Sequence, residues 1–263
     1  MARTILLTGA SGALGRMLAP RLGARGYDLR LSDIVAFPDP LPARAAFQQA
    51  DLADEAAVRR LVRGTDAILH FGGISVEQPF RRVFDANILG LTHLFEAARE
   101  KLQRVVFASS NHAIGYYERG TRLGTTDPMR PDGYYGLSKA YGELLGRMMF
   151  DKHGLESVHL RIGSCLAVPT EARHLSTWLS YDDLERLVVA ALDAPETGHA
   201  VVWGVSANAA SWWAADDAGR IGYTPKDDAS RFAPLPETGD AVTRRFQGGS
   251  FAAMNYTRDR SEP

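Results

Sequence analysis

A tyrosine and a lysine four residues apart are the first candidates for chemistry in this 263-residue chain. Tyr135 and Lys139 belong to the run Tyr-Gly-Leu-Ser-Lys and would share one face of a helix expected over residues 135–152. A nearby ammonium favours the phenolate, so it lowers the tyrosine pKa from its ordinary value of about 10. Tyr135 is therefore predicted to be a general base that removes a hydroxyl proton while a hydride leaves the same carbon.

The residues that precede this helix give the pair its context. Chance also supplies such a spacing in a chain with nine tyrosines, so the pair alone is only suggestive. A strand expected over residues 104–108 runs into Ser109, Ser110 and Asn111. Ligands of open α/β sheets bind at the carboxyl ends of the strands. Ser110 is therefore predicted to hydrogen-bond the oxygen whose proton Tyr135 removes.

A glycine-rich turn near the N-terminus predicts a dinucleotide site. Gly9, Gly12 and Gly15 lie between a strand expected at residues 4–8 and an amphipathic helix that follows. Glycines allow the tight turn and the close approach of backbone N–H groups to a pyrophosphate, and the helix N-terminus adds partial positive charge. The alternative is an incidental glycine-rich turn. The cofactor residues predicted here are Gly9, Gly12, Ala13, Leu14 and Gly15.

An acidic residue at the end of the second expected strand indicates which dinucleotide binds. Asp33 lies 18 residues after Gly15, where a carboxylate accepts hydrogen bonds from the adenosine ribose and repels a 2′-phosphate. NAD is therefore predicted over NADP. A solvated loop aspartate is the alternative, and the nearby cations Arg30 and Arg44 leave NADP open.

Further cofactor contacts are expected at the ends of the neighbouring strands. The positions follow the second, third and fourth expected strands, and small residues there let the backbone pass close to the cofactor. They are Ile34, Asp51, Leu52, Phe71, Gly72 and Gly73.

The alternation of short β-rich runs with helical patterns predicts the fold. We expect an α/β protein with a Rossmann-type doubly wound parallel sheet and a small C-terminal substrate lobe. Residues 1–165 would form the dinucleotide-binding domain, and residues 166–263 would complete the sheet and the lobe within one structural unit. The remaining strands are expected near 46–50, 67–71, 157–162 and 200–204, and further helices at 54–62, 84–101 and 181–194.

Composition excludes several classes of partner. The formal net charge is −1, with 45% hydrophobic and 23% charged residues, so neither nucleic acid nor a membrane is expected as a partner. A single cysteine, Cys165, excludes an intramolecular disulfide and favours a reducing compartment, and the short apolar run near Ile5 is no secretion signal, so we expect a cytoplasmic protein. No cluster has metal-ligand spacing, so no metal is predicted.

These motifs together resemble the extended short-chain dehydrogenase/reductase family over about residues 3–165. The resemblance rests on TGASGALG, Asp33, Asp51-Leu52, Ser110 and the Tyr-x-x-x-Lys motif. It implies that the tyrosine is the acid/base, that the lysine also binds the nicotinamide ribose, and that the serine positions the reacting oxygen. It also implies a supporting role for Asn87, which as a lone residue could equally cap or bond backbone.

Within that family, a closer resemblance to the uronate dehydrogenases spans nearly the whole chain. It is carried by HFGGISVEQPF, FASSNHAIGYY, RIGSC, HLSTWLSYDDL, WGVSAN and RFQGG. It implies oxidation of the anomeric C1 of galacturonate or glucuronate to an aldarolactone with NAD, in a homo-oligomer. Cys165 would lie near the cofactor. The implied substrate residues are Ser75, Ser110, Asn111, His112, Ser164, Arg173 and Phe251.

Physical chemistry supports part of this resemblance. A uronate needs a cation and short polar side chains, and Arg173 could form two parallel bonds to its carboxylate. Without the resemblance, Arg173 would be interpreted as a surface residue. His112 is expected to hydrogen-bond rather than to act as a base, and Phe251 to close the pocket. The sugar preference and the lactone ring size stay open.

Alternatives to this function remain. Another reductase, or a nucleotide-sugar epimerase or dehydratase, would use the same motifs, although only 128 residues follow Tyr135 and favour a small free sugar acid. A non-catalytic NAD-sensing protein is disfavoured by the tyrosine–lysine pair. The tryptophans at positions 178, 203, 212 and 213 are expected in the core or at an oligomer contact rather than under a sugar.

The role of Tyr135 can be tested by removing one oxygen atom. Tyr135→Phe should nearly abolish turnover and leave NADH binding intact, because the phenol carries the proton but does not grip the dinucleotide. Steady-state kinetics and a fluorescence titration with NADH measure the two properties. Retention of more than about a tenth of kcat would show that another group is the base.

Overall fold

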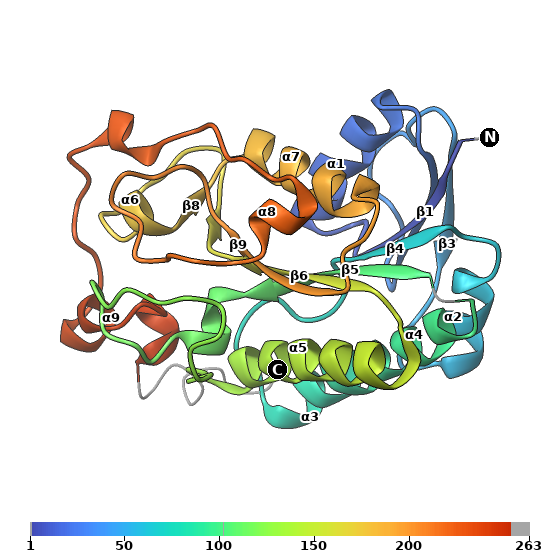
Figure 1. Ribbon diagram of the computed structural model, residues 1–263, viewed down its shortest axis with the longest axis horizontal. Coiled ribbons are helices and arrows are strands. Elements are labelled where there is room, and N and C mark those ends of the chain that lie inside the picture. Colours follow the sequence, from blue (N-terminus) through green and yellow to red (C-terminus); the bar gives the residue numbers. More distant parts are fainter. Residues whose placement is uncertain (1, 102, 254–263) are drawn as a thin grey trace.

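Seven parallel strands form the central sheet of the computed structural model, which describes residues 2–101 and 103–253 (Figure 1). Their order is β3-β2-β1-β4-β5-β6-β9. Successive strands are therefore added on one side of β1 as far as β3, and from β4 onward on its other side. This is the predicted doubly wound Rossmann-type sheet. The strands are β1 (Thr4–Thr8), β2 (Asp28–Asp33), β3 (Ala45–Gln49), β4 (Ala67–His70), β5 (Arg104–Ser110), β6 (Ser157–Ile162) and β9 (His199–Gly204).

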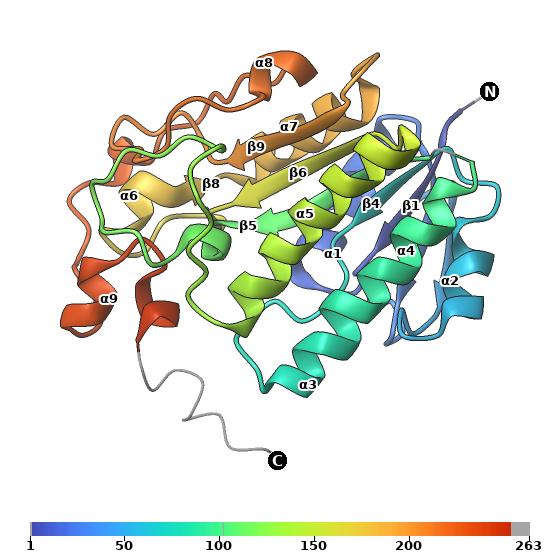
Figure 2. The ribbon, with the colours of Figure 1, turned by 60° about the horizontal axis from the view of Figure 1, so that its bottom comes forward.

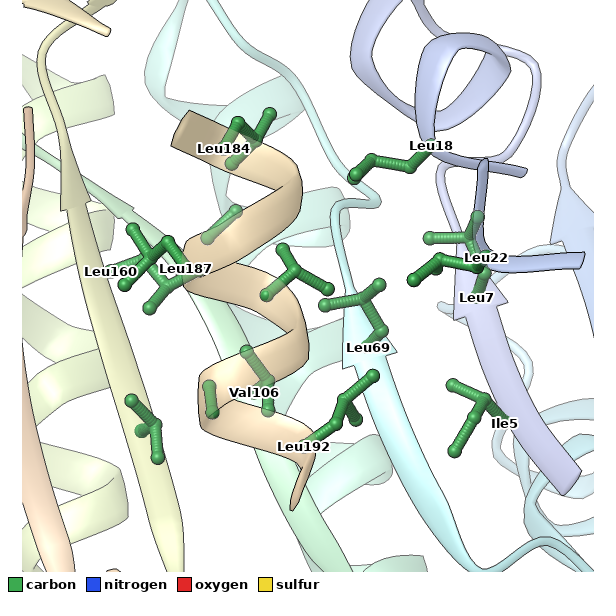
Figure 3. Close-up of a cluster of buried hydrophobic side chains, with 14 of the residues drawn as sticks. Ile5, Leu7, Leu18, Leu22, Leu69, Val106, Leu160, Leu184, Leu187 and Leu192 are labelled. Atoms are coloured by element: carbon green, nitrogen blue, oxygen red, sulfur yellow. The ribbon is translucent and has the colours of Figure 1, made fainter. Parts of the chain in front are cut away.

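Helices cover both faces of the sheet (Figures 1 and 2). Alternation within the strands divides the core: Ile5 and Leu7 of β1 pack with α1 (Ala13–Ala24) and α7 (Tyr181–Asp193), as Figure 3 shows. Leu6 points the other way, into a second cluster. The helices on that side are α2 (Glu55–Val62), α4 (Gly90–Arg99) and α5 (Tyr134–His153).

Short elements beyond the carboxyl ends of β5 and β6 make up the C-terminal lobe (Figure 2). A two-stranded parallel sheet joins β7 to β8. The elements of this part are β7 (Ser164–Cys165), α6 (His174–Thr177), β8 (Trp178–Leu179), a 3₁₀ turn (Ala229–Phe232), α9 (Ala241–Arg245) and a second 3₁₀ turn (Gly249–Ala252). The short helix α8 (Ala218–Ile221) instead lies beside β9 and packs on the cluster that contains α7.

The long helix expected over residues 84–101 differs from the prediction. It begins as α3 (Phe80–Val83), passes through a π-helical stretch (Phe84–Leu89) and continues as α4. A π-helical stretch within an α-helix is often found at a functional site, and this one carries the buried Asn87. A further 3₁₀ turn (Asn111–Ile114) follows β5. The frayed tail expected at residues 261–263 lies outside the described residues.

A buried ion pair ties α5 to β6, the strand next to the edge strand β9. Arg161 of β6 and Glu143 of α5 are 1% and 2% exposed, and two guanidinium nitrogens donate to the carboxylate at 2.7–3.1 Å. Ser109 of β5 donates to the same carboxylate at 2.6 Å. The guanidinium carbon lies 5.2 Å from the Trp203 ring, which stacks on Trp213. Trp178, Trp203 and Trp213 are buried, so the expected core position is confirmed for these three.

Removing one partner of this pair should destabilise the fold strongly. Arg161→Ala leaves the Glu143 carboxylate buried without its cation, so the free energy of unfolding should fall by about 3–5 kcal/mol. Urea unfolding followed by circular dichroism measures it. Arg147→Ala is the matched control, because its ion pair with Asp151 is half-exposed and should contribute less than about 1 kcal/mol. Equal losses in the two variants would contradict the role of the buried pair.

No helix in the described part of the chain is long and apolar enough to cross a bilayer.

Candidate active site

A cleft of about 670 Å³ opens at the carboxyl ends of β1, β4 and β5, where the strand order reverses. It contains every residue predicted to bind the cofactor and every residue predicted to be catalytic. The predicted residues that line it are Gly9, Gly12, Ala13, Leu14, Gly15, Asp33, Ile34, Asp51, Leu52, Phe71, Gly72, Gly73, Ser75, Ser110, His112, Tyr135, Lys139 and Cys165.

The turn after β1 has room only for glycine at two of its three positions. Gly9 has φ +71°, and a Cβ there would lie 2.4 Å from the Phe71 backbone. A Cβ on Gly15 would lie 2.2 Å from the carbonyl oxygen of Gly9. Gly12 begins α1, whose first backbone N–H groups are the donors that a pyrophosphate accepts. The turn therefore fits a dinucleotide.

The acidic residue at the end of β2 lies at the rim of the cleft and accepts hydrogen bonds from the backbone. Asp33 accepts from the backbone N–H of Ser11 at 3.0 Å and of Ile34 at 2.7 Å. The two cations that left NADP open bind elsewhere: Arg30 donates to backbone carbonyls, and Arg44 pairs with Asp28. A 2′-phosphate would meet a carboxylate here, which is the arrangement of an NAD site.

The first turns of α5 bring the tyrosine and lysine against the end of β5. Tyr135 and Lys139 are 8% and 6% exposed. The lysine Nζ donates to the Ala108 carbonyl at 2.8 Å, lies 4.8 Å from the Phe107 ring and is 5.5 Å from the Tyr135 ring. Ser110, at the end of the same strand, also lines the cleft. The structure thus brings the three predicted catalytic residues together.

The electrostatics of this cluster differ from the sequence prediction. Burial raises the pKa of Tyr135 to about 12, with a further rise from the charge of Asp132 and an opposing effect of a hydrogen bond with Ser110. Burial also lowers the pKa of Lys139 to about 8. The expectation that the lysine alone lowers the tyrosine pKa is therefore wrong for the free chain. Desolvation disfavours both charged forms, and the ammonium is directed to a carbonyl.

A buried glutamate that the sequence did not single out fixes the start of α5. The Glu77 carboxylate accepts from the backbone N–H of Tyr134 and of Tyr135, each at 2.8 Å. A Cβ on Gly133 would lie 2.4 Å from this carboxylate. Carboxylates stabilise helix N-termini, where backbone donors lack helical partners. Because Glu77 lies 57 residues before Tyr134, no local pattern marks it as a cap.

Asn87 joins the loop after β4 to the same helix. Its amide oxygen accepts from the Ile74 N–H at 2.7 Å, and its nitrogen donates to the Ile74 carbonyl and to Ser138 Oγ. Ser138 Oγ in turn donates to the Tyr135 carbonyl at 2.7 Å. Gly73 has φ +109°, and a Cβ there would lie 2.5 Å from the Asn87 oxygen. Asn87 therefore joins the Ile74 backbone on one side to the Ser138 hydroxyl of α5 on the other.

A second cavity of about 350 Å³ adjoins the first and contains a buried cation. Arg173 is 7% exposed, so its interpretation as a surface residue is wrong. Its Nε donates to the Gln247 carbonyl at 2.7 Å and its Nη1 to Ser164 Oγ at 2.9 Å. Asn111, with its amide turned to satisfy both ends, accepts from Nη2 at 2.9 Å. Burial lowers the Arg173 pKa to about 10, which leaves it a cation near neutral pH.

Two of the predicted substrate residues thus accept hydrogen bonds from Arg173. Asn111 is 1% exposed and lines neither cavity, although it orients the guanidinium. Ser164 both lines the second cavity and accepts from Arg173. Each Nη retains one N–H after these bonds, so the guanidinium keeps two donors for an anion.

Gln247 is a second residue that sequence reasoning missed. Its side chain is fully buried and accepts from Trp213 Nε1 at 2.9 Å. Its nitrogen donates to the carbonyls of Glu118 and Thr121 at 3.2 and 2.9 Å. With the amide satisfied on both sides, its backbone carbonyl lies in a fixed position against Arg173. The motif RFQGG contained it, but the pattern alone gave it no role.

Aromatic stacking closes the space between the two cavities. Phe251 stacks on His112 with ring centroids 3.9 Å apart, and the His112 ring meets the Tyr135 ring edge-on at 5.6 Å. The predicted position of Phe251 beside the site agrees with this packing. Burial raises the pKa of the Cys165 thiol to about 12, so it suits a packing role better than nucleophilic chemistry. Across residues 2–101 and 103–253, no group of three or more His, Cys, Asp and Glu side chains could hold a metal ion.

Known proteins share both the sequence and this arrangement. The model of the NAD dependent epimerase/dehydratase family matches residues 5–182. A uronate dehydrogenase of Pseudomonas syringae pv. tomato is 47% identical over 97% of this chain and 95% of its own. The crystal structure of a glucuronic acid dehydrogenase from Chromohalobacter salexigens superposes with a TM-score of 0.92, at 43% identity over 98% of this chain and 100% of that one.

A second solved structure contains the cofactor. It is a tyrosine-to-alanine mutant of the uronate dehydrogenase from Agrobacterium tumefaciens, complexed with NAD. The TM-score is 0.90, at 48% identity over 96% of this chain and 97% of that one. The chain therefore belongs to the NAD dependent epimerase/dehydratase family, and within that family it belongs with the uronate dehydrogenases.

Proposed function

We propose that this protein oxidises the anomeric C1 of a hexuronic acid to an aldarolactone and transfers the hydride to NAD. The observation that carries the proposal is Arg173, a buried guanidinium fixed by three partners in the cavity next to Tyr135. Burying a cation is costly unless it is bonded, and two of its N–H groups remain to donate to an anion. A carboxylate at one end of a sugar would meet Arg173 while C1 lies near Tyr135.

Each side chain around Tyr135 would have its own role in the reaction. Tyr135 takes the proton of the C1 hydroxyl, and Ser110 hydrogen-bonds the same oxygen as it becomes a carbonyl. Bound NAD supplies a hydride acceptor whose oxidised ring is positively charged. Lys139 is too buried to be a surface cation and lies where it can bind a ribose hydroxyl and attract the phenolate. Because the sugar reacts in its ring form, loss of hydride and proton from C1 gives a lactone directly.

The residues of the glycine turn and of β2 would hold the cofactor. Backbone N–H groups at the start of α1 fit the pyrophosphate, and Gly9 and Gly15 leave it room. Asp33 fits the adenosine ribose hydroxyls. Asp51, Leu52 and the backbone after β4 complete the lining of the cleft.

The sugar half would be held by side chains from both cavities. Ser75 lines the larger cavity, and His112 and Cys165 line both. Phe251 covers His112 and so limits the entry of water. We propose that His112 hydrogen-bonds a hydroxyl of the sugar rather than acting as the base, because Tyr135 already has that role.

Net formation of NADH separates this function from its alternatives. Galacturonate or glucuronate should produce NADH, followed by absorbance, because each oxidised C1 passes its hydride to NAD, which is then released as NADH. UDP-glucose and UDP-galactose should produce none, since an epimerase returns the hydride to its substrate. NADH from neither uronate, or epimerisation of a nucleotide sugar, would overturn the proposed function.

The carboxylate contact of Arg173 can be measured by truncation. Arg173→Ala should raise KM for the uronate roughly 10- to 100-fold, the range for losing hydrogen bonds to a charged group. The Kd for NADH should stay unchanged, because Arg173 lies outside the cofactor cleft. Arg60→Ala, at an exposed position of α2, is the matched control. An unchanged KM would assign the carboxylate to another residue.

A homo-oligomer is also proposed, from the exposed face of α5 and α3. Phe80, Tyr134, Leu137, Leu144 and Met148 are 42–62% exposed. Exposed apolar residues gathered on one surface mark an interaction site. Light scattering tests this assembly, and a monomer at micromolar concentration would contradict it. The single cysteine supports a cytoplasmic location, which cell fractionation checks.

A further inference from the structure

A buried aspartate lies behind His112 at the centre of the site. His112 Nδ1 and Asp132 Oδ2 are 2.7 Å apart, and the aspartate side chain has no exposed surface. The other oxygen, Oδ1, is buried and has no hydrogen-bond partner among the described residues. The mechanism above leaves this carboxylate without a role.

Three glycines leave just enough room for this carboxylate. A Cβ on Gly115 or Gly248 would lie 1.8 or 1.9 Å from Asp132 Oδ2, and one on Gly136 would lie 2.9 Å from Oδ1. Neighbouring side chains are thus excluded on several sides, so the carboxylate cannot turn away from His112 without displacing backbone. The geometry of the His112–Asp132 pair is therefore fixed by packing.

Other buried carboxylates in the described part of the chain have more partners. Asp183, for example, accepts from Arg186 and from two backbone N–H groups. Glu143 has two guanidinium bonds and a serine hydroxyl, and Glu77 has two backbone N–H groups. Asp132 has the imidazole as its side-chain partner and an unsatisfied oxygen. A buried polar atom without a partner costs free energy. Stability alone therefore does not explain why an aspartate is placed here.

The position of the proton on His112 follows from this contact. A carboxylate accepts hydrogen bonds and, while ionised, donates none, so Nδ1 carries the N–H that points to Asp132. The other nitrogen of a neutral imidazole, Nε2, is then an acceptor. His112 lines both cavities, between Tyr135 and Arg173, so the acceptor belongs to the part of the site that would hold the middle of the sugar.

We propose that Asp132 is a positioning residue that fixes the Nδ1–H tautomer of His112, so that Nε2 accepts a hydrogen bond from a ring hydroxyl of the sugar acid. The identity of the sugar rests on the proposed function, whereas the control of the tautomer does not. Phe251 completes the arrangement, because stacking at 3.9 Å restricts rotation of the ring.

The tautomer can be observed without any substrate. Nitrogen NMR of histidine-labelled protein separates Nδ1–H, Nε2–H and doubly protonated rings, and a His112→Gln variant assigns the His112 signals among the seven histidines. The wild type, with NAD present at the working pH, should show the Nδ1–H form. An Nε2–H or a doubly protonated ring would overturn the proposal, and this result needs no Asp132 variant to fold.

Asp132→Asn tests the link to the substrate. An amide in this place can donate to Nδ1, which moves the ring proton to Nε2 and replaces the acceptor by a donor. We expect the Nε2–H form and a fall in kcat/KM for the uronate of roughly 10- to 100-fold. Asp182→Asn, at an exposed residue paired with Arg21, is the matched control and should change neither. A variant that keeps the wild-type tautomer and activity would contradict the proposal.

Deoxy analogues separate positioning from a purely structural effect. A series of uronates would be tested, each lacking one hydroxyl. For one of them the wild type should have a low kcat/KM, and Asp132→Asn should lower kcat/KM no further, because the hydroxyl that bonds His112 is missing. An equal loss on every analogue would mean that Asp132 only maintains the fold. A wild type that shows the Nδ1–H form but oxidises no uronate would refute the proposed function and leave the tautomer control standing.

Discussion

The site depends on holding the first turns of α5 against the carboxyl end of β5. Lys139 donates to the Ala108 carbonyl, and Glu77 binds the backbone N–H groups that open the helix. Asn87 adds a third link through Ser138. These contacts come from three different segments of the chain, and each is buried or nearly so. Because all three converge within two turns, they fix the backbone that carries the Tyr135 ring, and the ring itself adds a hydrogen bond with Ser110 and an edge-on contact with His112.

The same burial that positions these groups sets their charge states. Desolvation raises the pKa of Tyr135 and lowers those of Lys139 and Arg173, so in the free chain the phenol is neutral at working pH. A base with so high a pKa gains activity only when positive charge comes close to it. The oxidised cofactor carries such a charge. Proton removal is thereby favoured when the oxidised cofactor is bound, which is also the state in which a hydride can be accepted. The lysine then need not bond the phenol, and its ammonium donates to the Ala108 carbonyl instead.

Local sequence signals predicted the sheet, the glycine turn and the catalytic trio, because each depends on neighbours close in the chain. The helix expected at residues 54–62 is one such prediction, and the structure confirms it as α2, whose N-cap Asp54 accepts from the Ala57 N–H. Glu77, Asp132 and Gln247 were missed because their partners lie 20 to 129 residues away. Without the resemblance, Arg173 would have been placed at the surface for the same reason: the carbonyl that orients it belongs to Gln247, 74 residues later. Long-range polar contacts leave no periodicity for a sequence pattern to reveal.

Different parts of the molecule would bind the two ends of the proposed substrate. Tyr135 and Ser110 belong to the sheet and α5, whereas Arg173 is oriented by Gln247, whose side chain is bonded to Trp213 and to the loop that contains Glu118 and Thr121. The separation of Tyr135 and Arg173, which the sugar acid would have to span, is thus set by how the C-terminal lobe packs on the sheet. His112 lines both cavities, and its Nδ1 lies 2.7 Å from Asp132 Oδ2. Changes in the lobe can therefore alter which sugar fits while the groups that remove hydride and proton stay in place.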